Sequence, residues 1–181
     1  MPTKKPFSLI LLIVFILAAC SPSGASVDLI KPSDKIGKMR VNRYGHTDAT
    51  LIWDYCPVHE FSEPGIQTVD CTVPMVSELF IGLGISATDK DQREALWEAR
   101  TWELSIDDYP VDLPSFNIAD FERDQGDKTT AHRIWRIRLR NLTAGAHSLR
   151  YVMHVDQSVP GDPAGQIPGT YELVVKFTVQ E

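Results

Sequence analysis

The chain has 181 residues, of which 24 are acidic and 18 basic, and its formal net charge at pH 7 is −6. The first 19 residues hold two of the basic residues and no acid, so the remaining 162 carry 16 basic against 24 acidic residues, a formal charge of −8. This balance argues against a nucleic-acid-binding protein, which is usually basic, and against a second, electrostatic contact with anionic lipid. Aromatic and β-branched residues are plentiful enough to exclude disorder by composition, and the length suits one sizeable domain.

The first 19 residues have the three parts of an export signal. Lys4 and Lys5 make a basic start, residues 7–17 (FSLILLIVFIL) are apolar apart from one serine, and two alanines follow. This order is typical of a secretory signal peptide. The apolar run over residues 7–19 is shorter than the roughly 20 residues that a transmembrane helix needs, so we expect cleavage. The alternatives are an uncleaved membrane helix and an ordinary signal that happens to precede a cysteine.

The stretch Leu17-Ala18-Ala19-Cys20 resembles the lipobox of bacterial lipoproteins. The resemblance implies diacylglyceryl transfer to the Cys20 thiol, cleavage before Cys20 and acylation of the new amino terminus. One acyl chain holds a protein only marginally to a bilayer, whereas two or three hold it firmly. We therefore expect a domain anchored by lipid to the cell membrane or outer membrane and facing the periplasm or the exterior. Ser21 favours the outer membrane, because aspartate at that position tends to retain Gram-negative lipoproteins in the inner membrane.

A tether is predicted between the lipidated residue and the folded part. Residues 20–35 hold few apolar groups and two prolines. Fifteen such residues reach at most about 50 Å when extended, which would hold a domain clear of the bilayer. The folded part is predicted to begin near Ile36, which gives a signal peptide over 1–19, a lipidated tether over 20–35 and a single domain over 36–181.

Two cysteines remain once Cys20 carries lipid. An even pair, Cys56 and Cys71, in an exported protein predicts a disulfide. The bridge would close a polar loop of about 15 residues and contribute roughly 3 kcal/mol in the chain-entropy model. The rival interpretation is a metal site on Cys56 and His59, but this C-x-x-H pair has no matching second half. We therefore expect neither a metal nor another cofactor.

Alternation of apolar and polar residues with a period of two recurs along the rest of the chain and predicts β-strands. The predicted strands cover residues 51–55, 78–86, 102–107, 132–140, 148–155 and 170–179. In the first of them, Leu51, Trp53 and Tyr55 would share one face.

One short helix is predicted over residues 88–99, which contain no β-branched side chain after Thr88. Thr88 is the expected cap of its amino end. Gly82 and Gly84, inside the strand before it, indicate a bulge or the close approach of another backbone.

Several short strands with turn signals between them and one disulfide predict an all-β fold of two packed antiparallel sheets. We expect an immunoglobulin-like β-sandwich, and a small barrel is the alternative. The last two strands are joined by a loop rich in glycine and proline, and we expect them to pair as neighbours. This likeness is one of fold alone and carries no function.

A stripe of arginines is the most unusual surface feature that the sequence predicts. Arg136, Arg138 and Arg140 alternate with apolar residues and therefore share the outward face of a strand. They are candidates for contact with an anion or a partner. The alternative, which the acidic balance of the chain favours, is a solvated stripe that pairs with the acids Glu103 and Asp107 across the sheet.

The sequence carries no catalytic motif. It has neither HExxH nor G-x-S-x-G nor S-x-x-K, and no cysteine is left for catalysis. His132 and His154 lie on predicted outward faces where they could meet, but solvated surface histidine is the favoured interpretation. Trp102 and Trp135 lie on apolar strand faces, which favours core packing over sugar binding.

We expect a non-catalytic binding or interaction module whose partner is an envelope protein, a glycan or a small ligand. Its contact surfaces would be the loops over 57–70, 107–116 and 156–169, because loops commonly carry recognition. The alternative is an extracytoplasmic, hydrolase-like enzyme with a site assembled from separated His and Asp residues.

Overall fold

The computed structural model describes residues 28–45, 50–58, 63–125 and 128–181. The predicted signal peptide over 1–19, the lipidation site Cys20 and the predicted metal ligand His59 lie outside these residues. Within the described ranges, no helix has the length and apolar character needed to cross a bilayer.

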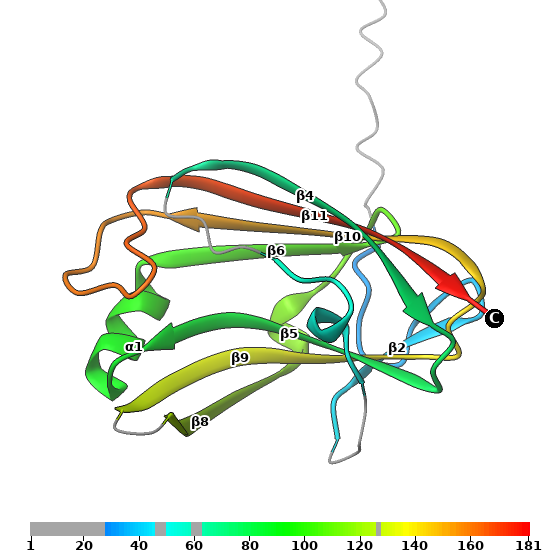
Figure 1. The fold of residues 1–181 in the computed structure, drawn as a ribbon, viewed down its shortest axis with the longest axis horizontal. Helices are drawn as coiled ribbons and strands as arrows, with labels where there is room; N and C mark the ends of the chain where they lie inside the picture. The colour runs from blue at the N-terminus through cyan, green and yellow to red at the C-terminus, as the bar shows by residue number, and fades with distance from the viewer. Residues whose placement is uncertain (1–27, 46–49, 59–62, 126–127) are drawn as a thin grey trace, which may run out of the picture.

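Two β-sheets pack face to face, and their strands run along the long axis of the molecule (Figure 1). The first sheet has the order β1-β2-β9-β5-β3, and β8 also pairs with β9. Its strands are β1 (Lys35–Ile36), β2 (Met39–Arg43), β3 (Thr50–Leu51), β5 (Glu78–Ala87), β8 (Asn117–Gln125) and β9 (Lys128–Arg140). The second sheet has the order β4-β11-β10-β6-β7. Its strands are β4 (Gly65–Pro74), β6 (Arg100–Ile106), β7 (Tyr109–Pro110), β10 (Gly145–Val155) and β11 (Gly169–Gln180).

The prediction of a mostly β fold with two packed sheets is confirmed. The last two strands, β10 and β11, pair as antiparallel neighbours, as predicted. The sheets are not purely antiparallel, because β4 runs parallel to β11 and β3 runs parallel to β5. A parallel pair needs a crossover rather than a tight turn, and the sequence patterns of the single strands did not reveal these two crossovers.

The core lies between the sheets and is built from alternate residues of the strands. Leu104 and Ile106 on β6, Ile137 and Leu139 on β9 and Phe177 on β11 are each at most 2 % exposed. These are the inward positions that the period-two pattern predicts. Burial of such a side chain contributes about 1.5–3 kcal/mol, so the alternation of β6, β9 and β11 stabilises the sandwich directly.

The strand predicted over residues 51–55 is wrong beyond its first residue. The chain leaves β3 after Leu51 and forms a 3-10 helix, η1 (Ile52–Asp54). Ile52 is fully buried, whereas Tyr55, which was predicted to share one face with Leu51 and Trp53, is exposed. The indole Nε1 of Trp53 donates a hydrogen bond of 2.8 Å to the Gly82 backbone oxygen, which fixes this turn against β5.

Five strands were not predicted: β2, β4, β8 and the two-residue strands β1 and β7. Two of them, β4 and β8, are edge strands with one open side, and most of their side chains are at least partly exposed. Exposed edge strands need no apolar face, so their sequences lack a clear alternation. Because β4 begins at Gly65, the second half of the segment that was predicted to be a loop over 57–70 is part of this strand.

The predicted helix is present as α1 (Lys90–Glu98), within the expected range of 88–99. Its cap is Asp89 and not Thr88, because the Asp89 Oδ1 accepts a hydrogen bond of 2.8 Å from the Gln92 backbone N–H. The Gln92 side chain in turn accepts a hydrogen bond from the Thr88 N–H. Two backbone donors at the start of the helix are thus satisfied.

Gly84 lies where β5 passes very close to β9, as the sequence predicted. A Cβ added at Gly84 would fall 2.0 Å from the Arg133 backbone oxygen, whereas at Gly82 the nearest atoms, on the Phe80 ring, would be 3.3 Å away. We expect Gly84→Ala to lower the free energy of unfolding by about 1–3 kcal/mol, because the added methyl overpacks the sheet. Gly82→Ala is the matched control. Equal free energies of unfolding for the two variants in urea would contradict this.

The described part of the predicted tether packs against the sandwich. The Ile30 N–H donates to the Pro110 oxygen (2.8 Å), the Asp112 N–H donates to the Ile30 oxygen (2.9 Å), and the Ile30 side chain is buried. Residues 35 and 36 form β1. The ordered body therefore includes residues before the predicted start at Ile36.

Candidate functional site

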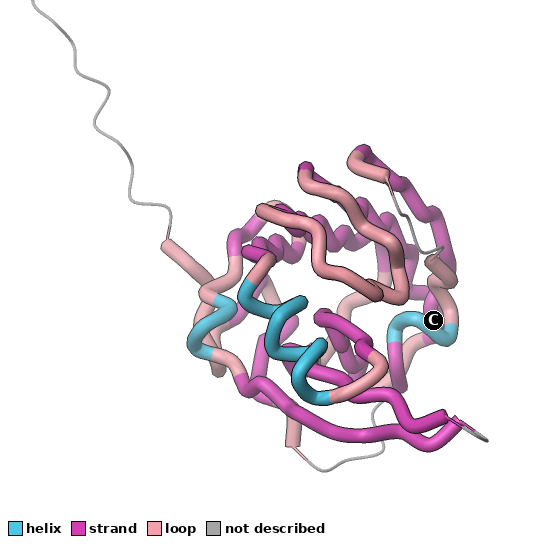
Figure 2. The backbone as a smooth tube through the Cα atoms, turned by 90° about the vertical axis from the view of Figure 1, so that its left-hand side faces the viewer, coloured by secondary structure: helices cyan, strands magenta, loops and turns pink. Residues whose placement is uncertain are grey.

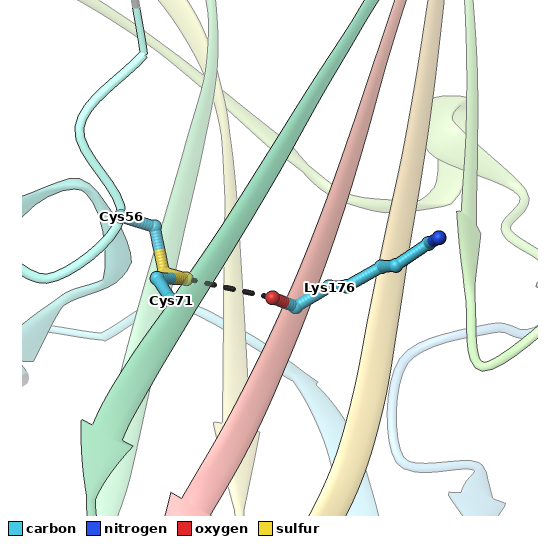
Figure 3. Close-up of a disulfide and its surroundings, with 3 residues drawn as sticks. All are labelled: Cys56, Cys71 and Lys176. Carbon is cyan, nitrogen blue, oxygen red and sulfur yellow. Dashed lines mark hydrogen bonds between the residues drawn. A yellow bond between two sulfur atoms is a disulfide. The ribbon is translucent and has the colours of Figure 1, made fainter.

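The predicted disulfide joins Cys56, just after η1, to Cys71 on the edge strand β4 (Figure 3). Cys56 is fully buried, and the Cys71 sulfur lies 3.8 Å from the Lys176 backbone oxygen on β11. The bridge therefore ties the segment after η1 to the second sheet. Because Cys56 is bonded to Cys71, it is not a free thiolate for the rival metal site with His59.

A cavity of about 370 Å³ opens at the end of the sandwich where α1 and the loop between β10 and β11 lie (Figure 1). Figure 2 views the molecule from this end, with α1 in front of the two sheets. Both sheets, α1 and the loop contribute to the wall, which is mainly apolar. The apolar side chains include Ile85, Leu96, Ile134, Met153 and Leu173, and the polar ones include Gln67, His132, Tyr151 and Gln166.

A buried ion pair frames this cavity. The Arg100 Nη2 lies 2.7 Å from the Asp162 Oδ2, and their side chains are 2 % and 5 % exposed. Arg100 also donates to the Leu96 backbone oxygen at the end of α1 (2.7 Å) and to the Gln166 Oε1. Asp162 accepts hydrogen bonds from the backbone N–H groups of Ala164 and Gln166. The pair therefore connects α1, β6 and the β10–β11 loop, and it adds no net charge to the cavity.

Aromatic side chains pack beside the cavity. Trp102 stacks on Tyr151, with ring centroids 5.7 Å apart, and Trp97 lies 4.4 Å from Trp135 and 5.5 Å from Trp102. The predicted core packing of Trp102 and Trp135 is confirmed. Burial raises the pKa of Tyr151 well above its usual value, with a smaller opposing effect of Arg100. The phenol therefore stays neutral at pH 7 and can donate or accept a hydrogen bond in the cavity.

The two histidines singled out in the sequence lie on different sheets, His132 on β9 and His154 on β10, and the structure does not bring them together. His132 lines the cavity wall, stacks on Phe121 and lies 2.8 Å from the Thr130 hydroxyl. Burial, and then the charge of Arg123, lower its pKa. His154 Nδ1 lies 3.0 Å from the Thr170 hydroxyl.

The described residues contain no group of three or more His, Cys, Asp or Glu that could hold a metal ion. Asp162 is the acid on the cavity wall, and its carboxylate is engaged by Arg100 and by the loop. The hydrolase-like alternative therefore has no assembled His–Asp pair at this cavity.

The arginine stripe pairs with a different acid from the ones predicted. Arg138 Nη1 and Arg140 Nε lie 3.3 and 3.0 Å from the two carboxylate oxygens of Glu78 on β5. The Arg136 guanidinium lies over the Tyr44 ring, 4.2 Å from its centroid.

The predicted pairing of the stripe with Glu103 and Asp107 is wrong, because these acids belong to β6 and the turn after it, in the second sheet. Asp107 Oδ1 accepts from the Ser148 N–H, and its Oδ2 lies 2.7 Å from His147 Nδ1. The strand patterns predicted which face the arginines occupy but not which strand lies beside them.

Of the three predicted contact loops, the one over 156–169 lies at the cavity and supplies Asp162, Ala164 and Gln166 to its wall. The loop over 107–116 contains β7 and the 3-10 helix η2 (Leu113–Ser115), and it packs on Ile30. The sequence did not single out Arg100 or Asp162. The glycines and prolines around Asp162 predict a turn, but nothing local indicates a partner 62 residues away.

No protein-family model and no curated protein matches the chain. A structure described as PbICP-C in complex with falcipain-2 is 15 % identical, covers 68 % of this chain and 95 % of its own, and has a TM-score of 0.35. The cysteine protease inhibitor EhICP2 from Entamoeba histolytica is 14 % identical, covers 65 % of this chain and 96 % of its own, and has a TM-score of 0.27. Similarities with TM-scores this low establish neither the fold nor the function of this chain.

Proposed function

We propose that the protein is an envelope lipoprotein, held to the membrane by acyl groups on Cys20, whose β-sandwich is a non-catalytic binding module. The basic start, the apolar run and the lipobox-like stretch before Cys20 support the anchor. The cavity at the α1 end supports the binding role, and it is the observation on which that role depends.

We also propose that the sandwich is immunoglobulin-like. In chain order, β5, β6, β8, β9, β10 and β11 would take the positions B, C, D, E, F and G of that fold. The neighbours β8-β9-β5 and β11-β10-β6 then agree with the D-E-B and G-F-C orders. One feature departs from the antibody pattern: the disulfide joins Cys56 to β4 instead of linking the strands in the B and F positions.

The composition of the cavity wall indicates the class of ligand. Ligand pockets generally measure about 300–1,000 Å³ and have apolar walls with a few polar groups, and this cavity of about 370 Å³ fits that description. Its two charged residues, Arg100 and Asp162, neutralise each other. An uncharged, mainly apolar group therefore suits it, either a small molecule or an apolar side chain of a partner.

The cavity and the first described residues of the chain lie at opposite ends of β6. Arg100 is the first residue of β6 and lies on the cavity wall, whereas Ile30 is bonded to Pro110, which pairs with Ser105 near the last residue of the strand, Ile106. Ile106 lies six residues after Arg100, a distance of about 20 Å along the strand. A domain anchored through its amino-terminal end would therefore present the cavity away from the attachment point.

Filling the cavity tests the binding role. Ala164 is a half-buried loop residue on the cavity wall, so Ala164→Trp places an indole at the cavity without changing a strand. We expect the neutral apolar probe N-phenyl-1-naphthylamine to bind the wild-type protein saturably. It should bind the Ala164→Trp variant at least about tenfold more weakly, because the indole would occupy the space in which the probe makes its apolar contacts.

Ala144→Trp is the matched control, since Ala144 is an exposed residue in the turn between β9 and β10, away from the cavity wall. It should bind the probe as the wild type does. Probe fluorescence that is unchanged in Ala164→Trp, or equally reduced in both variants, would refute the cavity as the binding site.

A further inference from the structure

The charges of this acidic chain are unevenly distributed. Residues 28–43 contain five basic and two acidic residues. They form β1, β2 and the turn before them, and β2 pairs with the carboxyl end of β9. We call the resulting surface the basic patch, and its members are Lys31, Lys35, Arg40, Arg43, Arg138 and Arg140.

The strand register places like charges of the basic patch side by side. Lys35 is directly opposite Arg40, and Arg40 is directly opposite Arg140. Like charges in such positions are destabilising. Glu78 is the neighbour of Arg140 on its other side, and this single carboxylate serves both Arg138 and Arg140. The fold therefore leaves an excess of positive charge on this surface.

A hollow lies within the basic patch. Its wall is formed by Lys31, Ser33, Asn42, Arg43, Ser115 and Arg138, together with one proline, and none of the described residues on this wall is acidic. The nearby Asp34 is engaged by the Lys31 backbone N–H at 2.7 Å. Three cations, two hydroxyls and one amide thus line the hollow. The neighbouring carboxylates are engaged from outside this wall: Glu78 pairs with Arg138 and Arg140, and Asp112 accepts a hydrogen bond from the Ser115 hydroxyl.

Two guanidinium groups of the hollow are held in place with donors to spare. Arg43 donates from Nε and Nη2 to the Ser115 backbone oxygen, at 2.9 and 2.8 Å, which fixes its plane and leaves Nη1 for another acceptor. The Arg138 Nε is buried and has no hydrogen-bond acceptor among the described residues. Preoriented guanidinium groups with spare donors are suited to bind phosphate oxygens.

We propose that this hollow is a binding site for a phosphate group, carried either by a lipid headgroup or by a soluble phosphate. The lipid source rests on the proposed anchor. If Cys20 is lipidated, the seven residues between it and residue 28 let residue 28 lie at most about 29 Å from Cys20. Lys31 follows Ile30, which is bonded to the sandwich, so the basic patch would lie near the bilayer surface.

Amide NMR of the full-length chain in neutral detergent tests the site with inorganic phosphate at constant ionic strength. We expect saturable shifts at the amides of residues 31, 33, 42 and 115. Lys31→Gln/Arg43→Gln should weaken binding at least about tenfold, because both charge-assisted contacts are lost. Arg123→Gln/Lys176→Gln removes the same charge from exposed sites elsewhere and should bind as the wild type does.

Arg43 also donates hydrogen bonds to the Ser115 backbone oxygen, so its replacement could disturb the fold as well as the site. The single variant Lys31→Gln is therefore measured beside the double variant. The Lys31 side chain makes no hydrogen bond or ion pair within the described structure, and its loss should weaken binding in the same direction. Absence of saturable shifts in the wild type would overturn the proposal. Equal weakening in the Lys31→Gln/Arg43→Gln and Arg123→Gln/Lys176→Gln variants would also overturn it.

Bilayer discs distinguish the two sources. If the ligand is a lipid headgroup, discs of anionic phosphatidylglycerol should shift the same amide signals, and those amides should no longer respond to free phosphate. Discs of phosphatidylcholine should neither shift the signals nor abolish the response. If the amides still respond to free phosphate in both disc types, the ligand is a soluble phosphate, and the proposal of a phosphate site in the hollow is retained. A chain without lipid on Cys20 would remove the anchor proposal and leave the detergent experiment unaffected.

Discussion

Replacing Asp162 by alanine should lower the free energy of unfolding by about 3–5 kcal/mol, the usual cost of breaking a buried ion pair from one side. The Arg100 side chain is 2 % exposed, so the variant would leave its charge buried without a carboxylate. The N–H groups of Ala164 and Gln166 would also lose their acceptor. Urea denaturation measures the change, and the β10–β11 loop should become more accessible to proteolysis.

Asp156 provides the matched control for this variant. It lies at the start of the same loop, is exposed, and contributes only a backbone hydrogen bond to Ala99. Asp156→Ala should therefore change the free energy of unfolding by no more than about 0.5 kcal/mol. If Asp156→Ala and Asp162→Ala unfold at the same urea concentration, the ion pair does not hold the cavity frame together.

Loss of the disulfide should have the second large effect. The two cysteines are 15 residues apart, and a bridge that closes a loop of this length contributes about 3 kcal/mol, mainly by restricting the unfolded chain. Cys56→Ala/Cys71→Ala should therefore lower the free energy of unfolding by about 3 kcal/mol.

A reducing agent provides the control for the disulfide variant. It should destabilise the wild-type protein towards the level of Cys56→Ala/Cys71→Ala and leave that variant unchanged. A wild-type protein whose unfolding in urea is the same with and without the reducing agent would show that the bridge does not stabilise the fold.

Strands with one buried and one solvated face could be predicted from the sequence. The alternation in residues 102–107 and 170–179 follows directly from burial of every second side chain, and both segments are strands with those faces. Residues 51–55 show the same alternation but turn into η1 after two residues of pairing with β5. Local pattern does not reveal whether a neighbouring strand continues beside a segment.

The candidate site was much less predictable than the strands. The outward face of Arg138 follows from its strand, but its partner Glu78 follows from the pairing of β5 with β9. Arg100 and Asp162 become a pair only when β6 and the β10–β11 loop meet at one end of the sandwich. Of the site elements, the loop over 156–169 and the segment over 57–70, which supplies Val58 and Gln67 to the wall, had been predicted to be contact surfaces, because loops commonly carry recognition.

The net charge also proved to be a poor guide to the surface. The formal charge of −8 on residues 20–181 argued against electrostatic contact with anionic lipid. Pairing of β1, β2 and β9 nevertheless gathers the cations of the basic patch at one end. Electrostatic interactions with a surface act over about one Debye length, roughly 10 Å, so local clustering matters more than the sum over the chain.

The proposed lipid on Cys20 matters most, because it would determine both which end of the domain meets the membrane and which end presents the cavity. Mass spectrometry of the amino-terminal tryptic peptide, from protein extracted from membranes, tests it directly. We predict a peptide over residues 20–35 that begins at Cys20 and carries acyl groups, because trypsin does not cleave efficiently between Lys31 and Pro32. We also predict a Cys20→Ala variant released from the membrane fraction. A peptide that still contains residues 7–19, or an unmodified Cys20, would contradict it.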